Sequence, residues 1–272
     1  MDGAAPLRLW TRATRLHTVA GLEPRNLGSM RIPRIHTPAP LADGATIALD
    51  EDAFNHAVRV LRLKQGDSII LFNGSGGEYE AELIEVQKKH ASASIGRFLD
   101  TTCESPLPII LGQCISRGEK MDYTIQKAVE LGVHQIVPLF SERCGVKLNQ
   151  QRQQKRLQHW HKVIISACEQ CGRNRLPRLR EAMRLDQWLE HLSSSLKLVL
   201  DPTAADSLAA LDHPDGEVAL LIGPEGGLTQ AELDAAVNSG FTGLRLGPRI
   251  LRTETAGVAA LSVMQHRWGD LG

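Results

Sequence analysis

Between residues 30 and 99 the chain alternates apolar and polar positions over short stretches, a spacing of two that predicts β-strands. Residues 67–72 and 78–86 carry this pattern on either side of a glycine-rich turn at 73–77, so they predict a β-hairpin, and residues 90–98 predict a further strand. Residues 52–63 have a helical spacing instead, with Asp50 placed to cap the first turn. We therefore expect a small β-barrel with one helical insertion.

The pattern changes after residues 100–108, a polar stretch with two prolines that predicts a linker between domains. From there on, short runs that are apolar throughout alternate with stretches of helical spacing. The apolar runs predict strands over residues 109–115, 135–140, 197–200, 218–222 and 243–246. The stretches between them predict helices over residues 120–131, 151–171, around Leu208, 229–239 and 253–268. This alternation predicts an α/β fold with a parallel sheet covered on both faces.

The ends of the last two helices are marked in the sequence. Thr229 with Glu232 three residues later forms a capping-box pattern, and Gly240 lies where a glycine commonly ends a helix. The final helix is expected to stop at Gly269 and to present one apolar face made of Ala256, Ala260, Val263 and Met264.

The formal net charge of the chain is zero, which by itself argues against a nucleic-acid partner, because phosphate binding requires an excess of Lys and Arg. The basic residues are unevenly spread, however. Residues 142–184 contain eleven Lys and Arg against three acidic residues. Such a segment is a solvated helix face about as often as a binding surface, so it permits an RNA partner without requiring one.

The five cysteines have irregular spacing, and no apolar run approaches the roughly 20 residues that cross a bilayer, so we expect a protein of the reducing cytoplasm. Cys168 and Cys171 form a CxxC pair, but without a second pair or paired histidines we expect no metal site, and His56 is expected to face RNA or to pack. Residues 1–29 are basic with few acids and predict a leader or extension, with the folded protein starting at Met30.

Polar and glycine-rich residues follow four of the predicted strands, in residues 116–120, 201–202, 223–227 and 247–256. Because ligands of open α/β sheets bind beyond the carboxyl ends of the strands, these segments predict a site at one edge of the sheet. Gly223, Gly226 and Gly227 would let peptide groups approach a ligand closely, although a strand-to-helix turn needs glycine for its own geometry as well. The usual mononucleotide and dinucleotide fingerprints are absent.

Two segments carry a specific resemblance. LLIGPEGGLTQAEL (residues 220–233) and LRLGPRILRTETA (244–256) are similar to the paired cofactor motifs of the SPOUT class of RNA methyltransferases. More narrowly, RIPRI near Met30, HAVRVLRLKQGD (56–67), QKAVELGV (126–133), SERC (141–144) and ACEQCGR (167–173) resemble the RsmE family of 16S ribosomal RNA uridine-N3 methyltransferases.

The resemblance implies an architecture, a cofactor and partners. It implies a PUA-like β-barrel over residues 30–100 and, over 109–272, a SPOUT α/β domain with a deep trefoil knot, a feature otherwise almost absent from proteins. It also implies S-adenosylmethionine as cofactor, 16S rRNA or the small ribosomal subunit as substrate, and a homodimer without a membrane partner. The implied cofactor-binding residues are Leu200, Ile222, Gly223, Pro224, Glu225, Gly226, Leu246, Gly247, Ile250, Leu251 and Thr255.

Methylation at N3 of uridine requires loss of the imide proton and stabilisation of a developing uracil anion. The planar donors of arginine match the two carbonyl oxygens that flank this nitrogen, so Arg249, Arg252 and Arg173 are the catalytic candidates. Glu225 or Glu254 could accept the proton, and the sequence does not choose between them. Each arginine could equally be a phosphate contact or a surface charge.

The target base must leave its stack, while basic residues hold the flanking backbone. The candidates for these RNA contacts are Arg59, Arg62, Lys64, Arg117, Lys120 and Arg143, each of which could instead be a solvated charge. Two other functions stay open. A SPOUT ribose 2′-O-methyltransferase would share the fold and cofactor, and a non-catalytic RNA-binding or assembly factor would bind RNA with a degraded cofactor loop. The intact GPEGG and RILRTETA segments argue against the second.

Overall fold

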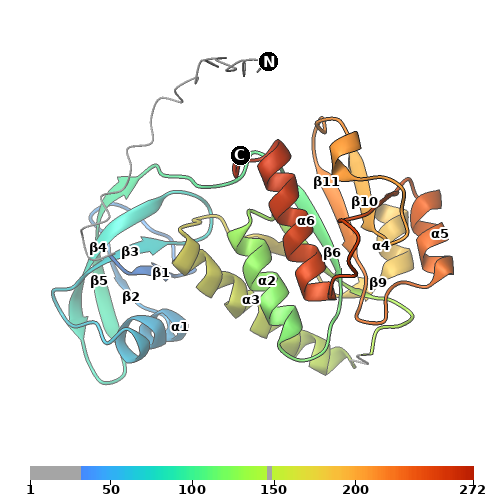
Figure 1. Cartoon of the computed structure of the whole chain (residues 1–272). Helices are drawn as coiled ribbons and strands as arrows, with labels where there is room; N and C mark the ends of the chain where they lie inside the picture. Colours follow the sequence, from blue (N-terminus) through green and yellow to red (C-terminus); the bar gives the residue numbers. More distant parts are fainter. Residues whose placement is uncertain (1–31, 146–148) are drawn as a thin grey trace, which may run out of the picture. The chain divides into compact units, whose positions relative to one another are not determined.

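The structure is a computed structural model and describes residues 32–145 and 149–272 (Figure 1). The predictions for residues 1–29 and for Met30 as the start of the fold lie outside the described residues, as does Lys147 of the basic segment.

The first sheet has five strands in the order β1-β3-β4-β5-β2. Their bounds are Arg34–His36 (β1), Thr46–Ala48 (β2), Ser68–Phe72 (β3), Glu78–Val86 (β4) and Ala91–Leu99 (β5). β3 and β4 pair antiparallel, which confirms the predicted hairpin, and the turn between them holds three glycines at positive φ. Alternate side chains of β5, at Ala91, Ala93 and Ile95, are buried in the core of this sheet, as a spacing of two requires.

The helical insertion is more irregular than predicted. α1 covers only Glu51–Phe54, and a π-helix, η1, continues it over Asn55–Val60 and ends before the expected Leu63. The predicted cap is confirmed, because the Asp50 carboxylate accepts hydrogen bonds from the backbone N–H groups of Asp52 and Ala53. Two residues after the π-helix, Arg62 has a φ of 58°, in the left-handed region that side chains rarely adopt.

The second sheet has the order β12-β10-β11-β6-β7-β8, with β9 also pairing with β7, and all of its pairs are parallel. The five predicted strands are confirmed as β6 (Ile109–Cys114), β7 (Gln135–Phe140), β10 (Leu196–Leu200), β11 (Val218–Ile222) and β12 (Thr242–Leu244). The sequence analysis missed β8 (Arg178–Leu179) and β9 (Met183–Arg184), which are too short to show a periodic pattern.

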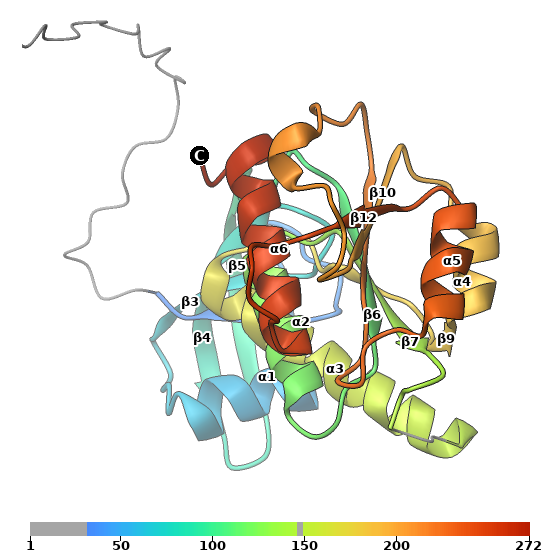
Figure 2. The same ribbon diagram turned by 45° about the vertical axis from the view of Figure 1, so that its right-hand side comes forward.

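Helices cover both faces of this sheet, as predicted (Figure 2). α2 (Lys120–Glu130), α3 (Gln150–Cys171) and α6 (Thr253–Trp268) lie on one face, and α4 (Leu185–His191) and α5 (Gln230–Asn238) on the other, with a 3-10 turn at Leu208–Ala210. α4 was not predicted. Its Trp188 ring packs on β6 at Gly112, where an added Cβ would lie 2.4 Å from the ring, so only glycine permits this approach.

The predicted helix ends are confirmed for α5, where Thr229 and Glu232 form the capping box and Gly240 follows the helix at a φ of 87°. For α6 one part of the prediction is wrong. Val263 is 43% exposed, while Ala260 and Met264 are buried. A search for apolar residues passes over the polar and small members of the buried stripe. The buried residues of α6 are Thr253, Gly257, Ala260, Leu261, Met264, Gln265 and Trp268.

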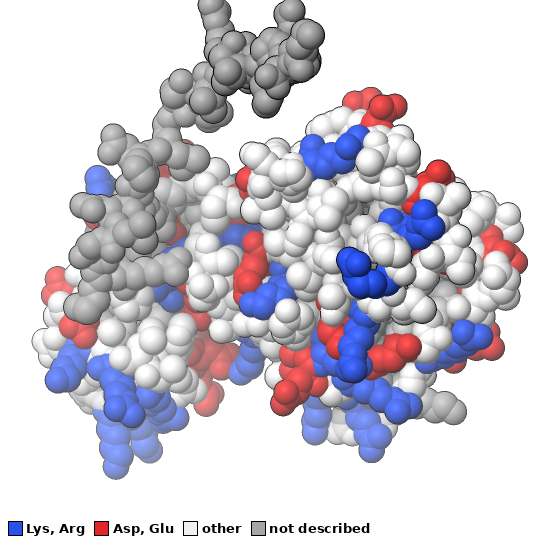
Figure 3. Space-filling model, in the orientation of Figure 1, with Lys and Arg blue, Asp and Glu red and all other residues white. Residues whose placement is uncertain are grey.

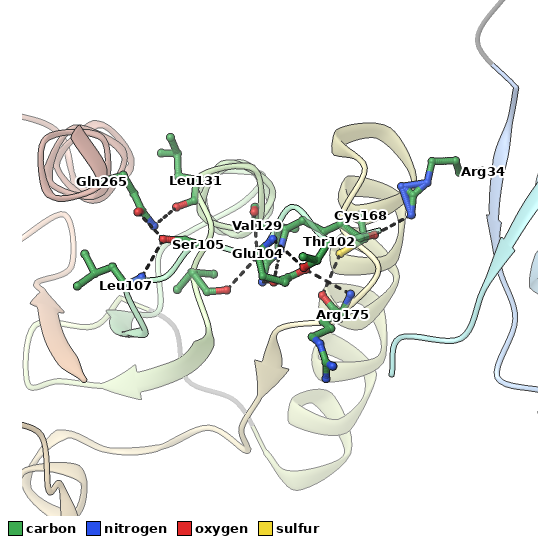
Figure 4. A network of polar contacts seen from close by, with 12 residues as sticks. Arg34, Thr102, Glu104, Ser105, Leu107, Val129, Leu131, Cys168, Arg175 and Gln265 are labelled. Atoms are coloured by element: carbon green, nitrogen blue, oxygen red, sulfur yellow. Dashed lines mark hydrogen bonds and ion pairs between the residues drawn. The ribbon is translucent and has the colours of Figure 1, made fainter. Parts of the chain in front are cut away.

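Residues 100–108 have no regular secondary structure, yet they are packed rather than loose. Leu107 is buried, and the Ser105 hydroxyl donates a hydrogen bond of 2.7 Å to Gln265 Oε1 on α6 (Figure 4). The residues Ile32–Gly272 accordingly form one compact unit that contains both sheets.

Candidate functional site

A cavity of about 630 Å³ opens beyond the carboxyl ends of β10, β11 and β12. Its walls come from the loops after these three strands, from the first turn of α6 and from Lys120 at the start of α2. This is the edge of the sheet at which the four polar and glycine-rich segments were expected to meet. The volume lies within the range of about 300–1,000 Å³ that is typical of pockets for small organic ligands.

The loop after β11 forms one wall of this pocket with its backbone. Gly227 has a φ of 68°, and its N–H donates to the Pro224 carbonyl, which closes a tight turn. Arg143 lies behind this wall, because its Nη1 donates to the Gly226 carbonyl at 3.2 Å and an added Cβ at Gly226 would meet the Arg143 side chain. The loop is thereby fixed from its outer side.

A buried amide joins this loop to the one that follows β12. The Thr253 hydroxyl donates to the Gly223 carbonyl at 2.6 Å, so its single proton is used, and it accepts a hydrogen bond of 3.0 Å from Gln113 Nε2 on β6. Gln113 is fully buried in an otherwise apolar strand, and its Oε1 has no hydrogen-bond partner among residues 32–145 and 149–272. The unpaired oxygen costs stability, which indicates that the amide is retained for holding the two loops together.

The loop after β12 offers unused peptide groups. The C=O groups of residues 246–251, and their N–H groups except at Pro248, which has none, form no hydrogen bond with any residue that the structure describes. The neighbouring walls are apolar, with Leu200, Ile222 and Leu251 among them, and Ile250 at the mouth is 85% exposed. Free peptide groups beside apolar walls suit a ligand that combines a flat heterocycle with polar edges, so the residues present fit an adenosyl cofactor.

Three charged side chains meet at the mouth of the pocket. Lys120 Nζ lies 3.5 Å from Glu225 Oε1 and 3.8 Å from Glu254 Oε2. Partial burial raises the pKa of Glu225, but hydrogen bonds from backbone N–H groups, including that of Arg117 at 3.0 Å, and the Lys120 charge outweigh it and leave the pKa below its usual value. Glu254 Oε2 is buried and accepts no hydrogen bond from the part of the chain that the structure describes, and Lys120 is its only ion-pair partner there. Glu225 is held as a carboxylate by its hydrogen bonds and by the Lys120 charge.

Most residues predicted to bind the cofactor line the pocket, and Thr255 is the exception. Thr255 is exposed on the first turn of α6, and the side chains beside it that reach the pocket are Thr253 and Ala256. Of the predicted catalytic residues, Glu225, Arg249 and Arg252 line the pocket, and Glu254 contacts it through Lys120. The structure thus brings together every catalytic candidate except Arg173.

Arg173 is a correction to the sequence analysis. It follows Gly172 at the end of α3 and is only 4% exposed, outside the pocket lining. Its Nη1 donates to the carbonyls of Val129 and Val133, at 3.0 and 2.9 Å, and its Nε donates to Glu104 Oε2 at 3.0 Å. Figure 4 shows the surrounding network, which joins Glu104 and Thr102 of the segment between the sheets to Arg34 and Arg175. Its Nη2 also donates to Glu104 Oε2, so four of its five N–H groups are bonded to protein atoms away from the pocket, which indicates a structural role.

The predicted RNA contacts fall into two groups. Arg59, Arg62 and Lys64 are exposed at and after η1, and Arg117 and Arg143 are exposed beside the pocket. Lys120, by contrast, lines the pocket and lies beside two carboxylates, so it is placed inside the pocket rather than on the surface where an RNA backbone would bind. The sequence analysis missed Gln113 and Thr253. Gln113 could have been noticed as an amide side chain inside the apolar run of β6. Thr253 could not be singled out, because the motif that contains it is rich in polar residues.

The cysteines do not add chemistry to this site. Burial raises the pKa of the Cys168 thiol to about 12, so it stays protonated at neutral pH. Within the described residues no group of three or more potential ligands is placed to hold a metal ion. Each helix in residues 32–145 and 149–272 is also too short or too polar to cross a membrane.

Comparison with known proteins agrees with this geometry. The profile of an RNA methyltransferase domain family matches residues 103–265, and that of an RNA methyltransferase PUA domain matches residues 49–96. Ribosomal RNA small subunit methyltransferase E of Buchnera aphidicola is 38% identical over 242 residues, which cover 89% of this chain and 98% of that protein.

Two solved structures are similar over nearly the same span. A protein of Legionella pneumophila, solved with the cofactor SAM, is 43% identical with a TM-score of 0.87 and covers 89% of this chain and 100% of its own. Ribosomal RNA small subunit methyltransferase E of Neisseria gonorrhoeae, solved with S-adenosyl methionine, is 42% identical with a TM-score of 0.83 and the same coverage.

Proposed function

Because the chain belongs to the ribosomal RNA small subunit methyltransferase E family, a SPOUT-class fold with a PUA domain, we propose that it transfers a methyl group from S-adenosylmethionine to N3 of a uridine in 16S rRNA. The observation that carries the proposal is the pocket at the ends of β10–β12, where free peptide groups and apolar walls meet a charged mouth. The related proteins from Legionella and Neisseria were solved with this cofactor.

The cofactor would supply an electrophilic methyl group on its sulfonium. The peptide groups of residues 246–251 and of Gly223 to Gly226 would bind its polar edges, and Leu200, Ile222 and Leu251 would pack on its apolar surfaces. Thr253 and Gln113 would keep the two loops at the distance this requires. These residues would exclude water from the bound cofactor and hold it in one orientation.

The mouth would handle the charge of the target base. Loss of the N3 proton leaves negative charge on the flanking carbonyl oxygens, and the guanidinium groups of Arg249 and Arg252, both exposed at the rim, can donate to those oxygens. Glu225 and Glu254 are the two carboxylates that could accept the proton. The pKa of Glu225 is lowered, which makes it a weaker base, and the Glu254 oxygen that accepts no hydrogen bond from a described residue is buried beside Lys120.

RNA binding would use basic residues around this mouth and on the barrel. Arg117 and Arg143 stand beside the pocket, and Arg59, Arg62 and Lys64 form an exposed basic group on the first sheet's helical insertion. We further propose a homodimer that works in the cytoplasm, in keeping with the family resemblance and with five cysteines that form no disulfide.

The test is nucleoside mass spectrometry of 16S rRNA from cells with and without the gene, followed by methylation of the unmodified RNA by the purified protein. The proposal predicts that N3-methyluridine disappears with the gene and returns with protein and cofactor. A 2′-O-methylated nucleoside in its place would favour the ribose methyltransferase. RNA binding without any methyl transfer would favour the assembly factor.

A further inference from the structure

The first half of α3 carries three basic side chains that form no ion pair with any residue that the structure describes. Arg152 and Lys155 are exposed and Arg156 is half-buried. None of the ion pairs among residues 32–145 and 149–272 includes any of them. The sequence from Asn149 to Cys168 contains no Asp or Glu that could neutralise them along the helix.

These cations also oppose the stability of the helix that carries them. The amino end of a helix bears partial positive charge, so acidic residues stabilise its first turn and basic residues destabilise it. α3 has no acidic residue in its first turn and places Arg152 there. Lys155 and Arg156 lie three and four residues after Arg152, where like charges on a helix repel each other. Farther along, basic groups are paired: Lys162 Nζ lies 2.7 Å from Asp52, and His159 Nε2 lies 2.6 Å from Asp122. The contrast singles out the first half of α3.

This half of α3 continues the basic rim of the pocket. The Arg117 guanidinium lies against Gly145, where an added Cβ would be 2.4 Å from its nitrogens, and Gly145 lies shortly before the Asn149 cap of α3. Arg143, in the same loop, donates to Gly226 in the pocket wall. Figure 2 shows the amino-terminal half of α3 beside the loop after β7, and Figure 3 shows Lys and Arg side chains gathered at this lower edge of the molecule.

We propose that Arg152, Lys155 and Arg156, continuous with Arg117 and Arg143, bind the phosphate backbone of the RNA that flanks the target nucleotide. The proposal rests on the proposed function and names a surface for its substrate. A partner with closely spaced negative charges recovers the energy that these cations cost the helix, and an extruded base needs its neighbours held. Exposed cations with no aromatic side chain among them suit backbone contacts rather than base recognition.

The experiment compares two double variants with the same change of charge. Arg152→Gln/Lys155→Gln removes two cations of α3, and Lys88→Gln/Lys89→Gln removes two exposed, ion-pair-free lysines in the turn between β4 and β5. Affinity for a 16S rRNA fragment is measured by fluorescence anisotropy over a salt series, with methyl-transfer kinetics alongside. The α3 variant is expected to bind roughly tenfold more weakly at low salt and to lose about 1.4–1.8 from the slope of log affinity against log salt. KM for RNA rises with it, while kcat and cofactor affinity stay unchanged.

An α3 variant with wild-type affinity and salt slope, or one no different from the Lys88/Lys89 control, would overturn the proposal. Weakened binding to the assembled small subunit with unchanged binding to naked RNA would overturn it too, in favour of an acidic protein partner. Failure of the proposed function is distinguishable, because it would abolish methyl transfer by the wild-type protein and leave the comparison of RNA affinities intact.

Discussion

Arg173 and Arg252 both lie in segments that resemble motifs of one enzyme family, yet the structure gives their guanidinium groups opposite surroundings. Arg173 is buried, and its donors are divided among Glu104 and two backbone carbonyls. Arg252 is exposed at the rim of the pocket, and its side chain forms no ion pair with any residue in the described part of the chain. What separates a structural arginine from a candidate catalytic one is therefore the set of acceptors around it.

The difference has an energetic side. Burying a guanidinium costs free energy that hydrogen bonds to its donors offset, so Arg173 depends on the carbonyls of Val129 and Val133 as much as they depend on it. An exposed guanidinium at a pocket mouth keeps its donors for a ligand. The first region contributes to the stability of the fold, and the second is available for binding and chemistry.

The sharpest test of this contrast is Arg173→Ala, which leaves the Glu104 carboxylate and two carbonyls without their donor. We expect a loss of about 3–5 kcal/mol in the free energy of unfolding, measured by urea denaturation. Arg252→Ala, the matched variant in the other region, is expected to change the same quantity by no more than about 0.5 kcal/mol. Equal free energies of unfolding for the two variants would contradict the distinction between a structural Arg173 and an Arg252 that is available for binding.

The next largest effect concerns the link between the pocket loops. Thr253→Val removes the hydroxyl that donates to Gly223 and accepts from Gln113, so the cofactor should bind about tenfold more weakly in calorimetry, as the loss of about 1.4 kcal/mol implies. Ser262→Ala removes a hydroxyl that only bonds Val258 on the same helix and should leave cofactor affinity unchanged.

Gln113→Leu sharpens this prediction, because it removes a buried oxygen that has no partner. We expect the variant to be at least as stable as the wild type toward urea and still to bind the cofactor more weakly. A variant that loses both stability and affinity would mean that Gln113 only supports the fold.

The smallest effect belongs to the ion pair between the first sheet's helical insertion and α3. Protonated His56 donates a hydrogen bond from Nδ1 to Glu169 Oε2 at 2.8 Å, and this bond raises the pKa of His56 despite partial burial. The raised pKa means that protonated His56 stabilises the folded protein. This contribution is complete at pH values below the His56 pKa of the unfolded chain, about 6.5, and is lost as the pH rises through the His56 pKa of the folded protein. His56→Gln should therefore cost up to about 1 kcal/mol in acid and almost nothing at alkaline pH.

Burial lowers the pKa of the neighbouring His36, which destabilises the fold in acid, but this contribution is present in both proteins and cancels in their difference. A stability difference between wild type and His56→Gln that does not depend on pH would contradict the assignment.

The sequence predicts the parts of the fold whose cause is local. The five apolar strands and the cap of α5 follow from periodicity and capping chemistry, and the pocket loops follow from glycines after apolar runs. α4 was missed because seven residues are too few to show a helical periodicity. Its packing also depends on the contact of Trp188 with Gly112, which is distant in the sequence. The partners of Arg173 and Gln113 are likewise set by tertiary contacts, which one sequence does not contain.

The most direct test of the central claim, that the rim of this pocket acts on a base presented to the bound cofactor, is the rate of methyl transfer by Arg252→Ala at saturating cofactor and 16S rRNA. We expect the rate to fall roughly a hundredfold to a thousandfold, as when an enzyme loses one hydrogen-bond donor to a developing anion. The dissociation constant for the cofactor is expected to stay at its wild-type value. A wild-type rate would contradict the central claim.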